Sequence, residues 1–161
     1  MDIIGQFPLF DFPEYGSAWM MGITGTIHIL ASHTSVGAAM LFAFLAYKAY
    51  KENRSDLYPY MKKYGMFLLI FSYVIGSITG PGIWYTATAA SPRGISALIH
   101  NFVWVWATEW VFFVYEVIGV FVLVYFIDKI DKKTHLKLTF SFALASVGTL
   151  ALIIGIISFM M

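Results

Sequence analysis

Four long runs of apolar residues divide the chain, and they carry almost no charge. They cover roughly residues 17–47, 64–79, 97–127 and 138–161. A helix needs about 17–25 residues to cross a bilayer, and the alternating pattern of barrel strands is absent. Helices are the other backbone arrangement that pairs every N–H and C=O in lipid. The pattern predicts an all-α integral membrane protein, one domain of four transmembrane helices. The Gly80-Pro81-Gly82 cluster is expected to end the second helix after Thr79.

Composition supports a membrane protein and excludes several other classes. Hydrophobic residues make up 60% of the chain and charged residues 12%, whereas a soluble domain has about 45–50% and about 25%. The chain has no cysteine, which excludes a disulfide scaffold, an Fe–S protein, a c-type haem protein and a cysteine-ligated zinc site. A net charge of +1 gives no reason to expect nucleic acid as a partner.

The basic residues predict the orientation, because they lie almost entirely in two loops. Nine of the ten lie between runs one and two or between runs three and four: Lys48, Lys51, Arg54, Lys62, Lys63, Lys129, Lys132, Lys133 and Lys137. Only Arg93 lies on the other side. Since basic loops stay in the cytoplasm, we expect an antiparallel bundle with both termini outside. His135 falls in one of these basic loops and is predicted to be solvated.

Two acidic residues remain inside the predicted spans, where an ionisable group is costly and usually functional. Glu109 and Glu116 are seven residues apart, so they share a helix face about 10 Å apart along the axis. No Lys or Arg lies within a span to pair with them. The two acids therefore suggest a proton path or the lining of a cofactor pocket. The alternative is two neutral acids that hydrogen-bond to neighbouring helices.

Two histidines lie within the first span, and their surroundings differ. His28 and His33 are five residues apart, so their directions differ by about 140°. His28 has small neighbours one turn away, Thr24, Gly25, Ala31 and Ser32, which would let a flat macrocycle lie against the helix. We expect His28 to ligate a haem iron, the alternative being small-residue helix packing. His33 would face another helix, another subunit or a second cofactor, or simply make an interhelical hydrogen bond.

Three further residues are candidates for the same cofactor. Glu109 is predicted at a depth similar to that of His28, so either Glu109 or His33 is a candidate second axial ligand. His100 lies near the outer end of the third span, where it either binds the cofactor or makes an interfacial hydrogen bond. Arg93 either neutralises a haem propionate or is an ordinary loop arginine.

The order of these residues resembles one known family. Residues 25–37, Gly-Thr-Ile-His-Ile-Leu-Ala-Ser-His-Thr-Ser-Val-Gly, resemble the first helix of subunit I of cytochrome bd quinol oxidases. Residues 76–80, Gly-Ser-Ile-Thr-Gly, resemble that family's second helix and its glycine-rich end. The two acids, followed by Asp128 twelve residues beyond Glu116, resemble its third helix. The resemblance runs from about residue 19 to about residue 133.

The resemblance implies roles for three residues. His28 would be the axial ligand of the active-site haem, Glu116 the inner glutamate of the proton path, and Glu109 the outer glutamate beside the haem. The spacing departs from the family here, because the acids are seven residues apart where the family has eight. His33 and His100 have no counterpart in it.

The family's subunit I is much longer, and its later helices supply further haem ligands and the quinol-binding loop. We therefore expect a short single-bundle relative and not a complete quinol oxidase, so whether this chain alone is an enzyme stays open. The sequence predicts a haem-b-binding electron-transfer subunit in a prokaryotic inner membrane. It would form a homo-oligomer or join a larger respiratory complex, with a quinol or a cytochrome as partner. The alternatives are a cofactor-free proton-conducting or quinone-binding subunit, and a membrane anchor for a redox partner.

Overall fold

A computed structural model describes residues 13–160 of the chain, and every element in that range is a helix. In order they are α1 (Gly16–Lys51), α2 (Leu57–Tyr64), the π-helical turn η1 (Gly65–Leu69), α3 (Ile70–Ala90), α4 (Pro92–Tyr125) and α5 (Lys132–Met160). Four stretches are long and apolar enough to cross a membrane: 16–51, 57–90, 92–125 and 132–159. The prediction of an all-α chain with four helices long and apolar enough to cross a membrane is confirmed.

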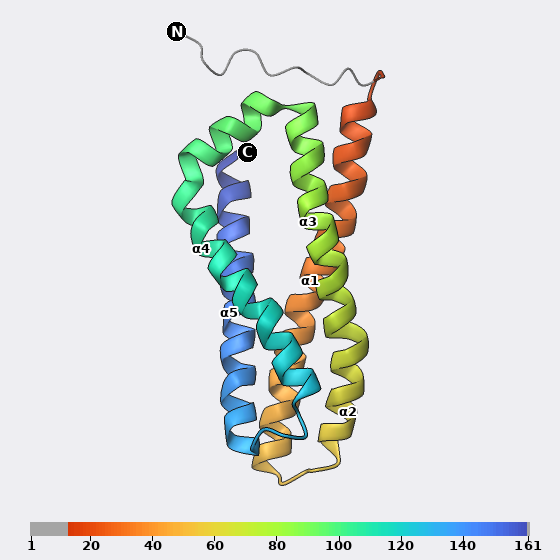
Figure 1. Cartoon of the computed structure of the whole chain (residues 1–161), viewed down its shortest axis with the longest axis vertical. Coiled ribbons are helices and arrows are strands. Elements are labelled where there is room, and N and C mark those ends of the chain that lie inside the picture. The colour runs from red at the N-terminus through yellow and green to blue at the C-terminus, as the bar shows by residue number, and fades with distance from the viewer. Residues whose placement is uncertain (1–12, 161) are drawn as a thin grey trace.

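The chain passes along the long axis of the molecule four times (Figure 1). In that view α1 runs from the upper end to the lower end, and α2 leads into α3, which returns to the upper end. The helix α4 then descends and α5 ascends. The helix α1 packs on both α3 and α5, while α4 packs chiefly on α5.

The second helix does not end at Thr79, so that prediction is wrong. The helix α3 continues through Pro81 as far as Ala90. A proline removes one backbone hydrogen bond, but a membrane helix tolerates the loss because nearby side chains re-pair the freed groups. Near the proline, the Thr79 hydroxyl lies 2.7 Å from the Ile75 carbonyl oxygen, which is not the carbonyl of Ser77 that Pro81 leaves without its backbone donor.

The other three membrane helices are longer than the apolar runs that predicted them. The helix α4 begins at Pro92, five residues before the expected start, and has a kink at Phe102, where φ is −122° and ψ is 21°. Figure 1 shows the part of α4 before this kink turning across the upper end of the molecule. The helix α5 begins at Lys132, so His135 belongs to a helix and not to a loop.

The tightly packed core lies toward the lower end, where the basic loops are. One face of α1 is lined with buried small residues: Ala31, Ser35, Ala38, Ala39, Ala43, Ala46 and Ala49. Small residues let membrane helices approach closely. Phe42, Met61, Val124 and Phe142 are fully buried beside this face.

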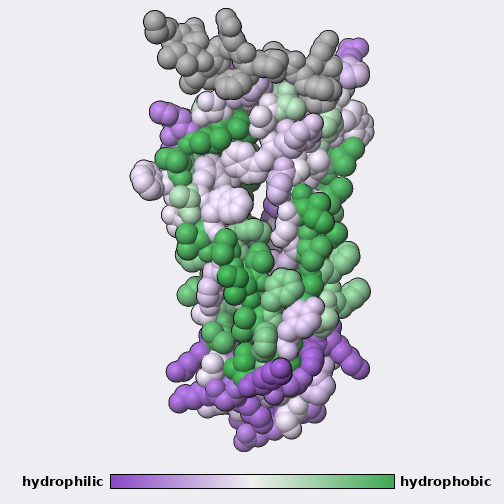
Figure 2. All heavy atoms as spheres, viewed as in Figure 1, coloured by the Kyte–Doolittle hydropathy of each residue, from purple (hydrophilic) through white to green (hydrophobic). Residues whose placement is uncertain are grey.

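Hydrophilic surface gathers at the same lower end, and hydrophobic surface lies above it (Figure 2). Lys62 of α2 forms an ion pair there with Asp128, which lies between α4 and α5. Both side chains are well exposed, so this pair joins the two basic segments without being buried.

Candidate functional site

Glu116 of α4 lies at the centre of a buried polar cluster, with only 4% of its surface exposed. Tyr73 of α3 donates its hydroxyl to Glu116 Oε2, and Ser146 of α5 donates to the same oxygen at 3.1 Å. Thr149 of α5 donates to Oε1. Both carboxyl oxygens are therefore paired by hydroxyl groups from two other helices. We call these four residues the Glu116 cluster.

The Glu116 cluster can rearrange when a proton arrives or leaves. The Tyr73 and Ser146 hydroxyl oxygens lie 3.2 Å apart, so they can pair with each other as well as with the carboxyl group. Ser146 and Thr149 also lie within reach of carbonyls of their own helix. A carboxylate accepts hydrogen bonds only, while a carboxylic acid also donates one. Each hydroxyl has a second partner, so either form of Glu116 leaves no member of the cluster unpaired.

Glu109 shares the helix face of Glu116 but not its surroundings. Its side chain is half-buried, and the part of the chain that the structure describes gives its carboxyl group no hydrogen-bond partner. The structure thus gathers hydroxyl donors around one of the two predicted acids and not around the other.

His28 of α1 packs against the bare backbone of α3. Its Nδ1 lies 3.0 Å from the Thr79 hydroxyl oxygen, and a Cβ added at Gly80 would lie 3.3 Å from His28 Cε1. The Thr79 hydroxyl has a single proton, and its oxygen lies 2.7 Å from the Ile75 carbonyl oxygen. In the tautomer in which Thr79 donates to that carbonyl, His28 Nδ1 donates to Thr79 and the lone pair of the ring is on Nε2.

The space beside His28 is open on both helices. A Cβ added at Gly25 of α1 or at Gly76 of α3 would meet no atom of the described residues within 4 Å. The small neighbours of His28 are thus not all used for close packing. The ring of His28 is half-buried, as expected of a group that lies between two helices.

His33, His100 and Arg93 are exposed. His33 Nδ1 lies 2.9 Å from the Ile29 carbonyl of its own helix, so this histidine makes a local contact. Arg93 lies in the first turn of α4.

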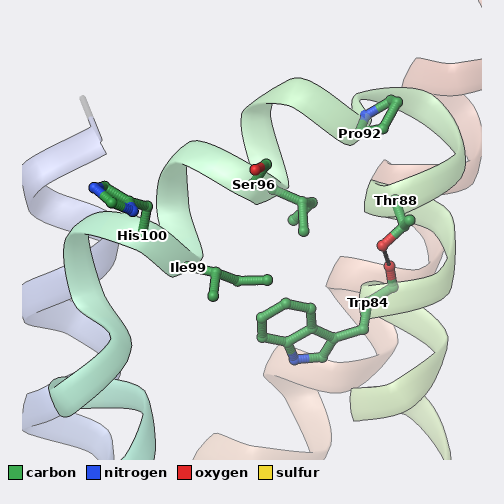
Figure 3. A pocket seen from close by; sticks show the side chains of 7 residues that line it. Trp84, Thr88, Pro92, Ser96, Ile99 and His100 are labelled. Carbon is green, nitrogen blue, oxygen red and sulfur yellow. Dashed lines mark hydrogen bonds between the residues drawn. The ribbon is translucent and has the colours of Figure 1, made fainter. Parts of the chain in front are cut away.

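His100 lies at one edge of a groove of about 480 Å³ between α3 and α4. The groove is lined by Trp84, Thr88, Pro92, Ile95, Ser96, Ile99 and His100. In Figure 3 the side chains of Trp84 and Ile99 point toward one another, whereas the His100 ring points away from them. The ring of Trp106 lies beside that of Trp84, with centroids 4.9 Å apart.

His135 is not solvated, and the prediction for this residue is wrong. It lies in the first turn of α5 with none of its surface exposed. The basic residues around His135 suggested a loop. The helix starts among them, before the apolar run, and places the His135 ring beside Phe42 and Tyr58. The signal in the sequence was the spacing of His135, Thr139, Phe142 and Ser146, which repeats every three or four residues.

The side chains available as ligands limit which metal-containing group could bind. Among residues 13–160, no three His, Asp or Glu side chains gather as a bare metal ion would require. A haem brings its own four nitrogen ligands, so one or two protein ligands are enough. The lone pair of His28 Nε2 fits that requirement.

Comparison of the chain with models of protein families, with curated proteins and with solved structures gave no match. The resemblance to subunit I of cytochrome bd quinol oxidases stays a prediction.

Proposed function

We propose that this chain is a membrane electron-transfer subunit that holds a haem b through His28, as a short relative of subunit I of cytochrome bd quinol oxidases. The observation that carries the proposal is the fixed imidazole of His28. A histidine that ligates a metal commonly donates its other ring N–H to a second group, which fixes the ring. With His28 Nδ1 as the donor, Thr79 accepts that bond, and Nε2 is left for iron.

The residues around His28 fit a flat macrocycle. The open space at Gly25 and Gly76 gives room beside the imidazole, and the helices supply apolar surroundings that lack water. When bound, the haem supplies one-electron chemistry. Glu109 or His33 would supply a second protein ligand, and the exposed positions of His100 and Arg93 suit contacts with the cofactor or with a partner.

The Glu116 cluster supports a proton-holding role beside electron transfer. A buried carboxyl group with rearrangeable hydroxyl partners can take up a proton when negative charge arrives nearby and release it afterwards. Tyr73, Ser146 and Thr149 hold the group in position for both states.

The proposal includes an orientation and a setting. The helices form an antiparallel bundle in a prokaryotic inner membrane, with the basic end in the cytoplasm and both termini outside. The chain works as a homo-oligomer or as part of a larger respiratory complex, and a quinol or a cytochrome exchanges electrons with it. The groove beside Trp84 has a volume in the range of small-molecule sites, which suits a quinone ring.

The test is the absorbance of the purified full chain. We expect a haem band, identified as haem b by a pyridine haemochrome assay, and its loss or shift in His28→Ala. Thr34→Ala is the matched control, because Thr34 is an exposed polar residue on the same helix with no role in the proposed site. A folded protein that stays colourless after supply of haem would contradict the proposal, as would a band that is unchanged in His28→Ala.

A second candidate is a proton-conducting subunit without a haem, and the Glu116 cluster favours it. This function predicts that Glu116→Gln blocks proton uptake into vesicles that contain the full chain, while the visible spectrum stays empty. Glu109→Gln is the control, because its carboxyl group lacks such a cluster. A haem band lost in His28→Ala would decide against this candidate.

A further inference from the structure

His135 and Tyr58 each carry a buried polar atom without a hydrogen-bond partner among the described residues, at the basic end of the bundle. The His135 ring lies between Tyr58 of α2 and Phe42 of α1, with centroids 5.8 and 6.0 Å away. Its Nε2 lies 3.4 Å from the Leu123 carbonyl of α4. His135 Nδ1 and the Tyr58 hydroxyl are buried and have no hydrogen-bond partner among the described residues. A buried group of this kind costs stability unless a water pairs with it.

A row of inward-facing residues on α5 joins this position to the Glu116 cluster. His135, Thr139, Phe142 and Ser146 are all fully buried, and they follow one another at intervals of four, three and four residues. They therefore lie on one face of the helix. His135 is at the basic end of the row, and Ser146 at the other end donates to Glu116. About 16 Å of helix separates His135 from Ser146.

Phe142 is the one apolar member of this row. Its ring lies 5.9 Å from that of Tyr73, and a Cβ added at Gly119 would lie 3.1 Å from its Cδ2. The ring thus contacts the Tyr73 ring of the Glu116 cluster, and it lies between Thr139 and Ser146 in the order of the row.

We propose that His135, together with the Tyr58 hydroxyl, takes up protons at the basic end and delivers them through water to Glu116, with Phe142 closing the path. This inference rests on the proton-holding role of Glu116 proposed above. With the Nε2–H directed at the Leu123 carbonyl, Nδ1 takes the proton and the ring becomes an imidazolium. The proton then leaves Nδ1 for water and reaches the Glu116 carboxylate, which becomes a carboxylic acid, while His135 returns to its neutral form.

The groups around His135 favour onward transfer. The helices α1 and α4 present Phe42 and the Leu123 carbonyl to it, and α2 presents Tyr58. Lys132 Nζ lies 5.8 Å from the centre of the Tyr58 ring. The Lys132 ammonium group is thus a nearby positive charge, and none of these neighbours of His135 is a carboxylate. An imidazolium here is therefore short-lived and gives up its proton.

The experiment measures how fast the Glu116 carboxyl group equilibrates with the bulk after a pH jump, by infrared spectroscopy of the purified full chain. The Glu116 signal is the carboxyl band that Glu116→Gln removes. We expect His135→Gln and Tyr58→Phe to slow equilibration by about a hundredfold, the lower end of what a positioned proton-transfer group contributes. We expect Phe142→Ala to speed it up. Tyr60→Phe, which removes the hydroxyl of an exposed tyrosine on the same helix as Tyr58, is the control and leaves the rate unchanged.

The outcomes separate the two proposals. If no carboxyl band disappears in Glu116→Gln, the proton-holding role of Glu116 fails and the entry path fails with it. If the band is present and His135→Gln equilibrates as fast as the unaltered chain, only the role of His135 is overturned. Should His135→Gln fail to fold, Tyr58→Phe decides, because it keeps the ring and removes only the hydroxyl.

Discussion

Glu109 and Glu116 lie on one face of the same helix, and yet the fold treats them differently. Glu116 receives hydroxyl groups from α3 and α5, whereas Glu109 is only half-buried. The positions of both acids could be predicted from the sequence, because charge within an apolar run is conspicuous. The hydroxyl partners could not, because Tyr73 and Ser146 are 43 and 30 residues away along the chain. Serine, threonine and tyrosine are also too common to single out.

Removing one hydroxyl of the Glu116 cluster should destabilise the protein. Tyr73→Phe keeps the ring but leaves a carboxyl oxygen with one donor fewer, so we expect a loss of about 1–2 kcal/mol in the free energy of unfolding. Glu109→Gln should change it by about 0.5 kcal/mol or less. Unfolding of both variants in detergent micelles measures the difference. Equal effects of the two substitutions would contradict the account given for the cluster.

At the scale of elements, the four membrane helices could be predicted and their ends could not. Lipid forces a long apolar run to be helical, so the runs identify the elements. Pro81 would break a helix in water, but α3 continues through it. The first turn of α5 is polar, so the helix begins at Lys132, before the apolar run. The prediction that His135 is solvated was wrong for that reason. His28 was singled out by its small neighbours, but its contact with Thr79 could not be predicted, because the two residues are 51 positions apart along the chain.

The π-helical turn η1 holds a glycine that packing requires. A Cβ at Gly65 would lie 2.6 Å from Val124 Cγ2 and 3.3 Å from Phe42, and a stiff valine cannot move away easily. Gly65→Ala should therefore cost about 1–3 kcal/mol in unfolding free energy. Gly37→Ala is the control, since a Cβ there meets no described atom within 4 Å, and it should be neutral or mildly stabilising. A neutral Gly65→Ala would mean that η1 and α4 are not in close contact.

The Asp131 carboxylate at the start of α5 makes the stability of the protein depend on pH in the acid range. The Asp131 carboxylate accepts the backbone N–H groups of Lys133 and Thr134 at 3.1 and 3.0 Å. Hydrogen bonds from Thr134, its side chain first, hold the pKa of Asp131 below its usual value. A lowered folded pKa stabilises the protein above the ordinary carboxyl pKa of about 4. This contribution is lost as the pH falls through the folded pKa.

Asp131→Ala should therefore lower the melting temperature at neutral pH, and the difference from the unaltered chain should shrink as the pH falls below about 4. Thermal unfolding of both proteins across pH 3–7 in micelles checks this. A difference that stays constant across this range would show that the carboxylate does not cap α5.

For the whole molecule, orientation can be tested directly because the chain has no cysteine of its own. Ser55 and Ser91 are exposed, one between α1 and α2 and the other between α3 and α4. In intact cells, an impermeant maleimide should label Ser91→Cys and spare Ser55→Cys, which reacts only after the cells are opened. The reverse pattern would overturn the orientation that the basic loops predict.

The uneven distribution of the tightly packed residues has a consequence for biogenesis. They gather toward the lower end, while the helices around Gly25 and Gly76 keep free space beside them. Helices that few buried contacts hold together separate more readily than a dense core. The haem proposal therefore predicts that the helices assemble in lipid first, held at the densely packed end, and that the haem enters between them at the looser end afterwards.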